Sequence, residues 1–367
     1  MIPFLDLKAS YAELSEALDT AVLRASRSGW YIGGPEVEAF ERDFAVYTQS
    51  NFCVGVGNGL DALTLALRAL DVGAGDEVIV PSHTFIATWL AVSAVGAIPV
   101  PVEPSAGSYH ITAENIASHI TARTKVIMPV HLYGIPAEID AICDLAKKHG
   151  LFVVEDAAQA HGAKLKNTRI GAHGDIVAWS FYPGKNLGAL GDGGAITTHH
   201  QTLAERVRKL GNYGSAVKYQ NEERGVNSRL DPIQAAVLAV KLKHLDTWNQ
   251  RRQQFAEVYQ KAFAELHVGL PVVPENAESV WHLYVITTAK RQALQTYLTA
   301  QGIQTLIHYP VAPHRQKAYQ DLVIKQGTLP LAERYANEVM SLPMGPQLTL
   351  EQVEQVADAV KTFFKSQ

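Results

Sequence analysis

The most constraining feature of this chain is a stretch of 25 residues, Val78 to Val102, that contains no Asp, Glu, Lys or Arg. Such a stretch must be removed from water, and its length would suffice to span a lipid bilayer. However, prolines interrupt it and no basic flank orients it, as a membrane helix would require. The pattern is more typical of a βαβ unit in a protein interior. We expect a strand over Glu77–Pro81, a helix over Ile86–Val95 and a strand over Ala97–Val102.

Five further apolar runs predict buried strands of the same sheet. Helical segments such as Glu138–His149 and Leu203–Leu210 fall between the strands, which indicates an α/β architecture with helices on both faces of the sheet. We therefore predict a mostly parallel, seven-stranded sheet sandwiched by helices. The five additional strands are expected at Phe52–Val56, Lys125–Val130, Leu151–Glu155, Asp175–Phe181 and Ala195–Thr198.

The last third of the chain has a different pattern. One long helical stretch, Asp231–Leu266, leads to a strand-like run at His282–Thr288 and to helices near Arg291–Gln301 and Leu350–Lys365. We place a domain boundary near Asp246. Residues 1–245 are then predicted to form a large domain and residues 246–367 a smaller C-terminal α+β domain.

The segment from Ser180 to Ala195, SFYPGKNLGALGDGGA, places Lys185 in a glycine-rich turn beyond an apolar strand. A lysine amine that is partly desolvated in such a turn can have its pKa lowered enough to attack an aldehyde. The same letters are compatible with a solvated loop lysine. Lys185 is therefore a candidate Schiff-base nucleophile.

A second segment, Leu151 to Gly162, ends an apolar strand with Glu155 and Asp156. Ligands of parallel sheets bind beyond the carboxyl ends of the strands, where Asp156 would lie. A carboxylate at that place matches the partner that a pyridinium nitrogen requires. Asp156 is equally compatible with the N-cap of a helix.

A third segment, Val54 to Leu70, runs from a short strand through a glycine-rich turn into a helix with a leucine face. The backbone amides of such a turn form an anion site without a basic side chain. The turn is not a dinucleotide fingerprint, because Leu60 stands where the last glycine of G-x-G-x-x-G is needed. This segment therefore favours a binding site for the phosphate of a cofactor other than a dinucleotide.

These three segments together resemble the fold-type I pyridoxal phosphate enzymes, and specifically the DegT/DnrJ/EryC1/StrS family of nucleotide-sugar aminotransferases. The resemblance covers nearly the whole chain. It includes IPFLDL at Ile2–Leu7, SGWYIGGPEVEAFE at Ser28–Glu41 and LPMGPQLT at Leu342–Thr349.

The resemblance implies pyridoxal 5'-phosphate as the cofactor. Lys185 is similar to the lysine that forms the Schiff base, and Asp156 to the partner of the pyridine nitrogen. An asparagine similar to Asn227 comes from the neighbouring subunit in this family, which implies a homodimer with shared active sites. The other implied contacts are Gln159 to the ring hydroxyl, Phe85 stacked on the ring, and Ser180 with the Gly59 and Leu60 amides around the phosphate.

The resemblance also implies a substrate. The lysine loop is similar to those of members that act at carbon 3, which implies transfer of an amino group from L-glutamate to a dTDP-3-keto-6-deoxyhexose. The product would be a dTDP-3-amino-3,6-dideoxyhexose for bacterial surface glycans, such as the O-antigen of lipopolysaccharide. The expected substrate-side residues are Tyr182, His161, Arg229, His308 and Tyr309. The individual roles of His161, His308 and His314 stay unassigned, because each is also compatible with a core or loop histidine.

Two alternatives remain open from the sequence. The keto position or the nucleotide could differ, as in a 4-keto or a UDP sugar. The chain could instead be a non-catalytic regulatory protein that binds pyridoxal phosphate, because a fold does not fix a function. Some family members carry histidine in place of the lysine and dehydrate sugars, and Lys185 argues against that activity.

Composition excludes several other classes. A net charge of −4 offers no basic patch for nucleic acid. The chain has 14 histidines, but no metal-binding motif, so we expect no metal. Cys53 and Cys143 are too few for a disulfide framework, and the N-terminus has no signal-peptide pattern. We expect a cytoplasmic enzyme without membrane segments.

Overall fold

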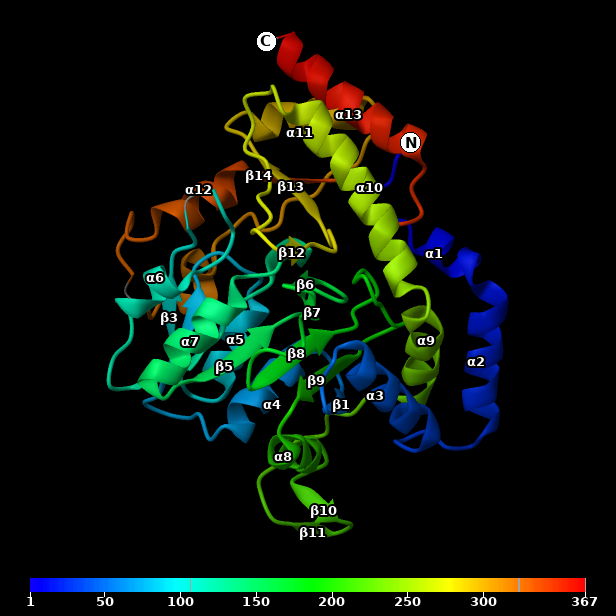
Figure 1. Cartoon of the computed structure of the whole chain (residues 1–367), viewed down its shortest axis with the longest axis vertical. Coiled ribbons are helices and arrows are strands. Elements are labelled where there is room, and N and C mark those ends of the chain that lie inside the picture. The colour runs from blue at the N-terminus through cyan, green and yellow to red at the C-terminus, as the bar shows by residue number, and fades with distance from the viewer. Residues whose placement is uncertain (106, 323, 367) are drawn as a thin grey trace.

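The computed structural model describes residues 1–105, 107–322 and 324–366, and its centre is a seven-stranded sheet (Figure 1). Six of the strands run in the same direction, and β9 is antiparallel to both of its neighbours. The predicted α/β fold with a mostly parallel sheet is confirmed. In spatial order the strands are β1 (Phe52–Val56), β9 (Gly194–Thr198), β8 (Ile176–Ser180), β5 (Phe152–Asp156), β4 (Thr124–Ile127), β2 (Glu77–Pro81) and β3 (Ile98–Val102).

The uncharged stretch forms the predicted βαβ unit, with α5 (Ala87–Ala94) between the parallel strands β2 and β3. Trp89 lies on α5, is fully buried, and donates its indole N–H to the carbonyl of Pro81 over 2.9 Å. The crossover is therefore fastened to the end of its first strand. Within the described residues, no helix has both the length and the apolarity to cross a membrane.

Helices cover both faces of the sheet, because successive strand residues point to opposite sides. On β2, Ile79 packs into one core, together with α3 (Pro35–Tyr47), α7 (Ile139–His149) and α9 (Pro232–Leu242). Its neighbours Val78 and Val80 pack into the other core, with α4 (Gly59–Ala69), α5 and α8 (Gln201–Gly211). In this three-layer packing, the carboxyl ends of the parallel strands lie together at one edge of the sheet.

The prediction of one helical stretch over Asp231–Leu266 is wrong, because the helix is interrupted at Lys243 and His244. The stretch forms two helices, α9 and α10 (Leu245–Phe263). The two helices pack on different partners, which one straight helix could not reach. α9 lies against α2 (Ser15–Arg27) and α3, whereas α10 lies against α13. Neither glycine nor proline marks the break in the sequence.

The C-terminal part has a core of its own, formed by α10, α11, α13 and the antiparallel strand pair β13 and β14 (Figure 1). The domain boundary near Asp246 stays a prediction. The bounds of these elements are α11 Arg291–Ala300, α13 Leu350–Lys365, β13 Tyr284–Thr287 and β14 Val339–Leu342. The remaining elements are α1 Leu7–Glu13, α6 Ala113–Ala117, α12 Pro330–Glu338, β6 Lys164–Leu165, β7 Thr168–Arg169, β10 Ser215–Val217, β11 Gln220–Asn221 and β12 Ala277–Glu278.

The start of α4 touches the end of β8. A Cβ atom added to Gly59 would lie 2.6 Å from the Cβ of Ser180, which is closer than two such atoms can approach. The Asn58 side chain caps α4 by accepting a hydrogen bond from the amide of Asp61 over 2.9 Å. Glycine is thus required at position 59 because the helix start and the strand end are in direct contact.

We expect Gly59→Ala to lower the free energy of unfolding by about 1–3 kcal/mol, because the added methyl group forces α4 away from β8. Gly73→Ala is the matched control, since the nearest atom to its added Cβ lies 4.0 Å away. Thermal or urea unfolding of both variants measures the difference. Equal stability of the two variants would contradict the close contact.

Candidate active site

Lys185 lies beyond the end of β8, in a turn closed by its own amide, which donates to the carbonyl of Tyr182 over 2.8 Å. Burial lowers the pKa of the Lys185 amine to about 8, and the carboxylate of Asp156 acts in the opposite direction. An ordinary lysine has a pKa near 10.4, so far more of the Lys185 amine is unprotonated at neutral pH. The turn therefore presents a usable nucleophile.

Asp156 is the last residue of β5 and is buried. Thr88 donates its hydroxyl to Oδ2 over 2.9 Å, and the amide of Ala158 donates to Oδ1 over 3.2 Å. Burial raises the pKa of Asp156, whereas the two hydrogen bonds and the charge of Lys185 lower it. The Asp156 carboxylate is thus fixed by two hydrogen bonds at the sheet edge, with the charge of Lys185 nearby.

Gln159 follows Asp156 and is held in one orientation. Its Oε1 accepts from the amide of Tyr133 over 2.6 Å, so its Nε2 is the donor, and it donates to the hydroxyl of Tyr309 over 3.0 Å. The ring of Tyr309 lies 5.3 Å from the ring of Phe85, which is half exposed. Gln159, Phe85 and Tyr309 are therefore close together, although they come from three distant segments of the chain.

The predicted phosphate-side residues also meet. The contact between Gly59 and Ser180 brings the first turn of α4, with Leu60, to the end of β8. Backbone amides at a helix start attract anions. The exposed side chain of Tyr182 lies on the adjoining lysine turn, and its amide donates to the Ser180 hydroxyl over 3.3 Å.

Two predicted residues, Asn227 and Arg229, lie apart from this group. Asn227 is exposed and pairs with Asn212 in an isolated bridge. Arg229 donates to the side chain of Asn212 over 2.9 Å and lies over the ring of Tyr213. The intervening Ser228 accepts from the Gly57 amide and donates to Asp61, so the segment runs close to the start of α4.

The predicted histidines differ in access. His161 is fully buried against Trp179 and Phe181, and burial followed by the charge of Lys185 lowers its pKa to about 3. Direct contact of its ring with a substrate is therefore not favoured. Burial also lowers the pKa of His308 to about 4, and its Nδ1 lies 2.8 Å from the hydroxyl of Ser341.

His314 lies outside this group. It is buried near Glu333, at 3.4 Å, on the C-terminal side of the chain.

Sequence reasoning missed four residues that surround Lys185 and Asp156. Thr88 lies in the SHTFIAT segment, and its spacing one helical turn after Thr84 was the signal available. Tyr133 contacts Gln159, and its hydroxyl donates to the carbonyl of His308. Asn186 and His282 form a buried hydrogen bond beside the lysine turn, and no sequence pattern predicts this contact.

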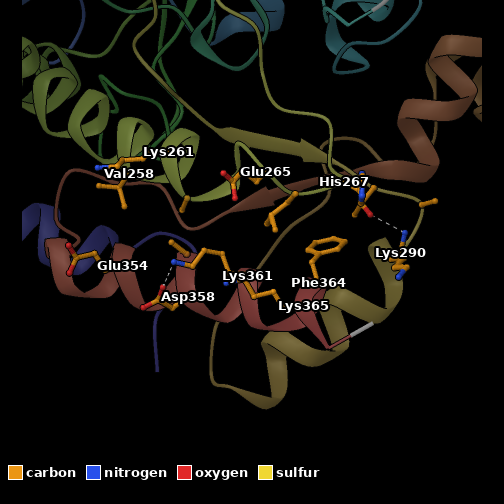
Figure 2. Close-up of a pocket in the computed structure, with 15 residues that line it drawn as sticks. Val258, Lys261, Glu265, His267, Lys290, Glu354, Asp358, Lys361, Phe364 and Lys365 are labelled. Atoms are coloured by element: carbon orange, nitrogen blue, oxygen red, sulfur yellow. Dashed lines mark hydrogen bonds and ion pairs between the residues drawn. The ribbon is translucent and has the colours of Figure 1, made fainter.

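Cavities lie both at this site and away from it. A small cavity of about 20 Å³ is lined by Lys185 and by Lys241, whose pKa burial also lowers to about 8. The Lys241 amine donates to the carbonyl of Gly188 over 2.7 Å, which fastens the glycine-rich loop. Figure 2 shows a different cavity, of about 1120 Å³, between the end of α10 and α13, where Lys361 pairs with Asp358. That cavity contains none of the predicted site residues.

A family model described as the DegT/DnrJ/EryC1/StrS aminotransferase family matches residues 12–361. The chain belongs to this family. It is 53% identical over 361 residues to a dTDP-3-amino-3,4,6-trideoxy-alpha-D-glucose transaminase of Streptomyces venezuelae, covering 98% of this chain and 95% of that protein. It is 52% identical over 363 residues to a dTDP-3-amino-3,6-dideoxy-alpha-D-galactopyranose transaminase of Aneurinibacillus thermoaerophilus, covering 99% of each.

A solved structure gives the same result for the fold. The crystal structure of S. venezuelae DesV in complex with a ketimine intermediate matches with a TM-score of 0.97 and 52% identity, over 99% of this chain and 98% of that one. The resemblance stated from the sequence is thereby confirmed.

We expect the apoprotein to form an imine with added pyridoxal phosphate at a rate that rises with pH and levels off with a midpoint near pH 8, because only the free amine of Lys185 attacks. The Asp156 carboxylate raises the pKa of Lys185, so Asp156→Asn should move the midpoint to lower pH. Stopped-flow absorbance measures both profiles. Asp192→Asn, at an exposed carboxylate in the same loop, is the control and should leave the midpoint unchanged. A wild-type midpoint near pH 10 would contradict the buried amine.

Proposed function

We propose that this protein is a pyridoxal phosphate-dependent transaminase that transfers an amino group from L-glutamate to carbon 3 of a dTDP-3-keto-6-deoxyhexose. The observation that carries the proposal is that the Lys185 amine and the buried Asp156 carboxylate lie near enough at the carboxyl edge of the sheet for the charge of each to influence the pKa of the other. A nucleophilic amine and a buried carboxylate are the two groups that this cofactor requires. Family membership and the names of the relatives support the choice of reaction.

The residues of the site fit the cofactor. Asp156 is a buried carboxylate whose hydrogen-bond partners are neutral, so it can accept a hydrogen bond from a pyridinium N–H. Gly59 has no Cβ atom, so the start of α4 lies directly against Ser180. The backbone amides of this helix start can bind a phosphate. Gln159 and Phe85, which both contact Tyr309, would contact the ring hydroxyl and the ring face. When bound, pyridoxal phosphate supplies an electron sink that stabilises negative charge on the substrate carbon.

The chain's own residues then have distinct tasks. Lys185 Nζ would hold the cofactor covalently and, as a free amine, would move a proton as a general base and acid. A pKa of about 8 suits both directions of that transfer near neutral pH. Asp156 holds the pyridinium proton, and Thr88 holds the carboxylate of Asp156 in place.

The substrate class follows from the relatives and is part of the proposal. Both named relatives make dTDP-linked 3-amino sugars, but their names differ at carbon 4, where one product lacks an oxygen and the other keeps it. We infer a 3-keto-6-deoxy sugar for this chain, with a product destined for bacterial surface glycans. Tyr182, His308 and Tyr309 are the candidates for contact with the sugar, because they surround the lysine turn. Assays with the gluco, galacto and 4-deoxy forms of the 3-keto sugar would show which of these sugars is the substrate.

We expect Lys185→Ala to bind pyridoxal phosphate but to turn over at less than about a thousandth of the wild-type rate, because the nucleophile and the proton carrier are both lost. Absorbance during addition of glutamate, followed by product analysis with the keto sugar, measures both halves of the reaction. Lys243→Ala, at an exposed lysine, should keep wild-type activity.

Two results would lead to the alternatives. A wild-type absorbance spectrum that glutamate does not change would favour a non-catalytic, regulatory protein. Turnover of a 4-keto or a UDP sugar in preference to the dTDP-3-keto sugar would change the substrate but not the class of enzyme.

We further propose a homodimer in which Asn227 completes the phosphate site of the partner subunit. The exposed position of Asn227, beyond the hydrogen bonds that tie Ser228 to the start of α4, leaves its side chain available to a second chain. A two-fold interface presents each such contact twice. A hydrogen bond to a charged phosphate contributes about 1.5–3 kcal/mol, so Asn227→Ala alone should bind the cofactor less tightly.

We expect mixed Lys185→Ala and Asn227→Ala subunits to recover activity above the sum of the two parents, because each heterodimer would contain one intact site. The measurement is steady-state turnover after subunit exchange has been verified by mass spectrometry of differently tagged chains. If Asn227→Ala is impaired and the exchanged mixture shows no gain, Asn227 serves its own subunit.

A further inference from the structure

The residue after the candidate nucleophile, Asn186, has a buried side chain that connects the lysine turn to the C-terminal part of the chain. Its Nδ2 group donates to Oδ1 of Asn249, on α10, and to the carbonyl of Val280, each over 2.9 Å. Both N–H groups of the amide are thereby used. The remaining atom, Oδ1, faces Nδ1 of His282 at 3.1 Å.

The tautomer of His282 follows from these contacts. Oδ1 of Asn186 can only accept, so Nδ1 of His282 carries the hydrogen and donates it. In the neutral ring, Nε2 then carries the lone pair. Burial holds the pKa of His282 well below its ordinary value, and the charge of Lys185 lowers it further. His282 is therefore a fixed neutral donor near the nucleophile.

His282 is itself held rigidly. The fully buried guanidinium of Arg252, on α10, donates Nη1 to the carbonyls of Trp281, His282 and Met344 at 3.1–3.3 Å. On the other side, Nδ2 of Asn249 donates to the carbonyl of His161 over 2.9 Å. The hydrogen bonds of Asn186 therefore join the lysine turn, α10 and the segment before β13, and Asn249 extends the network to the loop after β5.

We propose that His282 is a positioning residue, which through its hydrogen bond to Asn186 holds the turn of Lys185 in place and keeps water away from the amine. The inference rests on the proposed function, because it assigns His282 a role in the use of Lys185. It does not require contact between His282 and the substrate. Loss of the hydrogen bond would loosen the turn and let water solvate the amine.

The direction of the effect can be worked out from the groups around Lys185. Desolvation is the largest influence on its pKa, and it is opposed by Asp156. Removing desolvation therefore raises the pKa of Lys185 from about 8 toward the ordinary value. The other titratable groups around the turn are His161, His282 and His308, which burial keeps neutral, with Arg252 and Lys241 further along the same cavity.

The test is the pH dependence of imine formation between apoprotein and pyridoxal phosphate, measured by stopped-flow absorbance for wild type, His282→Leu and His282→Asn. We expect His282→Leu to shift the midpoint upward by about one pH unit, which lowers the rate at pH 7 about tenfold. His282→Asn places an amide N–H where Nδ1 was, so its rate should return to within about twofold of wild type. His110→Leu is the control, because it removes a buried, neutral histidine that does not contact the lysine turn.

The outcomes separate this inference from the proposed function. Wild-type protein that forms no imine at any pH would overturn both. Normal imine formation in wild type, with an unchanged midpoint in folded His282→Leu, would overturn the role of His282 alone, as would equal shifts in His282→Leu and His110→Leu. If His282→Leu does not fold, Asn186→Ala removes the same hydrogen bond from the other side. It should give the same upward shift, and an unchanged midpoint there would also overturn the inference.

Discussion

The site depends on removing one amine from water. A lysine in water is protonated and unreactive at neutral pH, and burial of the Lys185 turn is what lowers its pKa to about 8. The same burial would make Asp156 a poor anion if it stood alone, since desolvation raises the pKa of its carboxyl. Thr88, the Ala158 amide and Lys185 itself counteract that cost. The pKa values of Lys185 and Asp156 are therefore set by burial, by hydrogen bonds and by the charge of each on the other.

The sheet provides the geometry for this balance. β5 and β8 are neighbouring parallel strands, so their ends place Asp156 and Ser180 at one edge. The start of α4 reaches the same edge because Gly59 allows it to touch Ser180. Three separate segments of the chain thus supply the anion, the nucleophile and the backbone amides. The C-terminal part closes the arrangement through Asn186, Asn249 and Arg252.

Much of this could be predicted from the sequence, for physical reasons. Fully buried strands are short apolar runs, and each of the seven expected runs is a strand of the central sheet. Asp156 and Lys185 were found because they lie at and beyond strand ends, where ligands of parallel sheets bind, whereas the role of Ser180 came from the resemblance. The roles of Phe85, Gln159 and Asn227 came only from the resemblance, and the role of each remains a prediction.

What the sequence did not reveal depends on contacts between distant segments. The break between α9 and α10 has no glycine or proline, because it arises from the different surfaces on which the two helices pack. The hydrogen bond between Asn186 and His282 joins residues 96 positions apart, and neither residue type signals it. His161 was expected near substrate, but its ring is enclosed by Trp179 and Phe181, which are core residues of β8 and the segment after it.

Two lysines at this site have a pKa lowered to about 8, and the account assigns covalent chemistry to only one of them. The most direct measurement is borohydride reduction of the protein loaded with pyridoxal phosphate, followed by peptide mass spectrometry. The account predicts that the reduced pyridoxyl group is found on Lys185, whose turn lies beside Asp156. Modification of Lys241, or of exposed lysines in no fixed place, would contradict it.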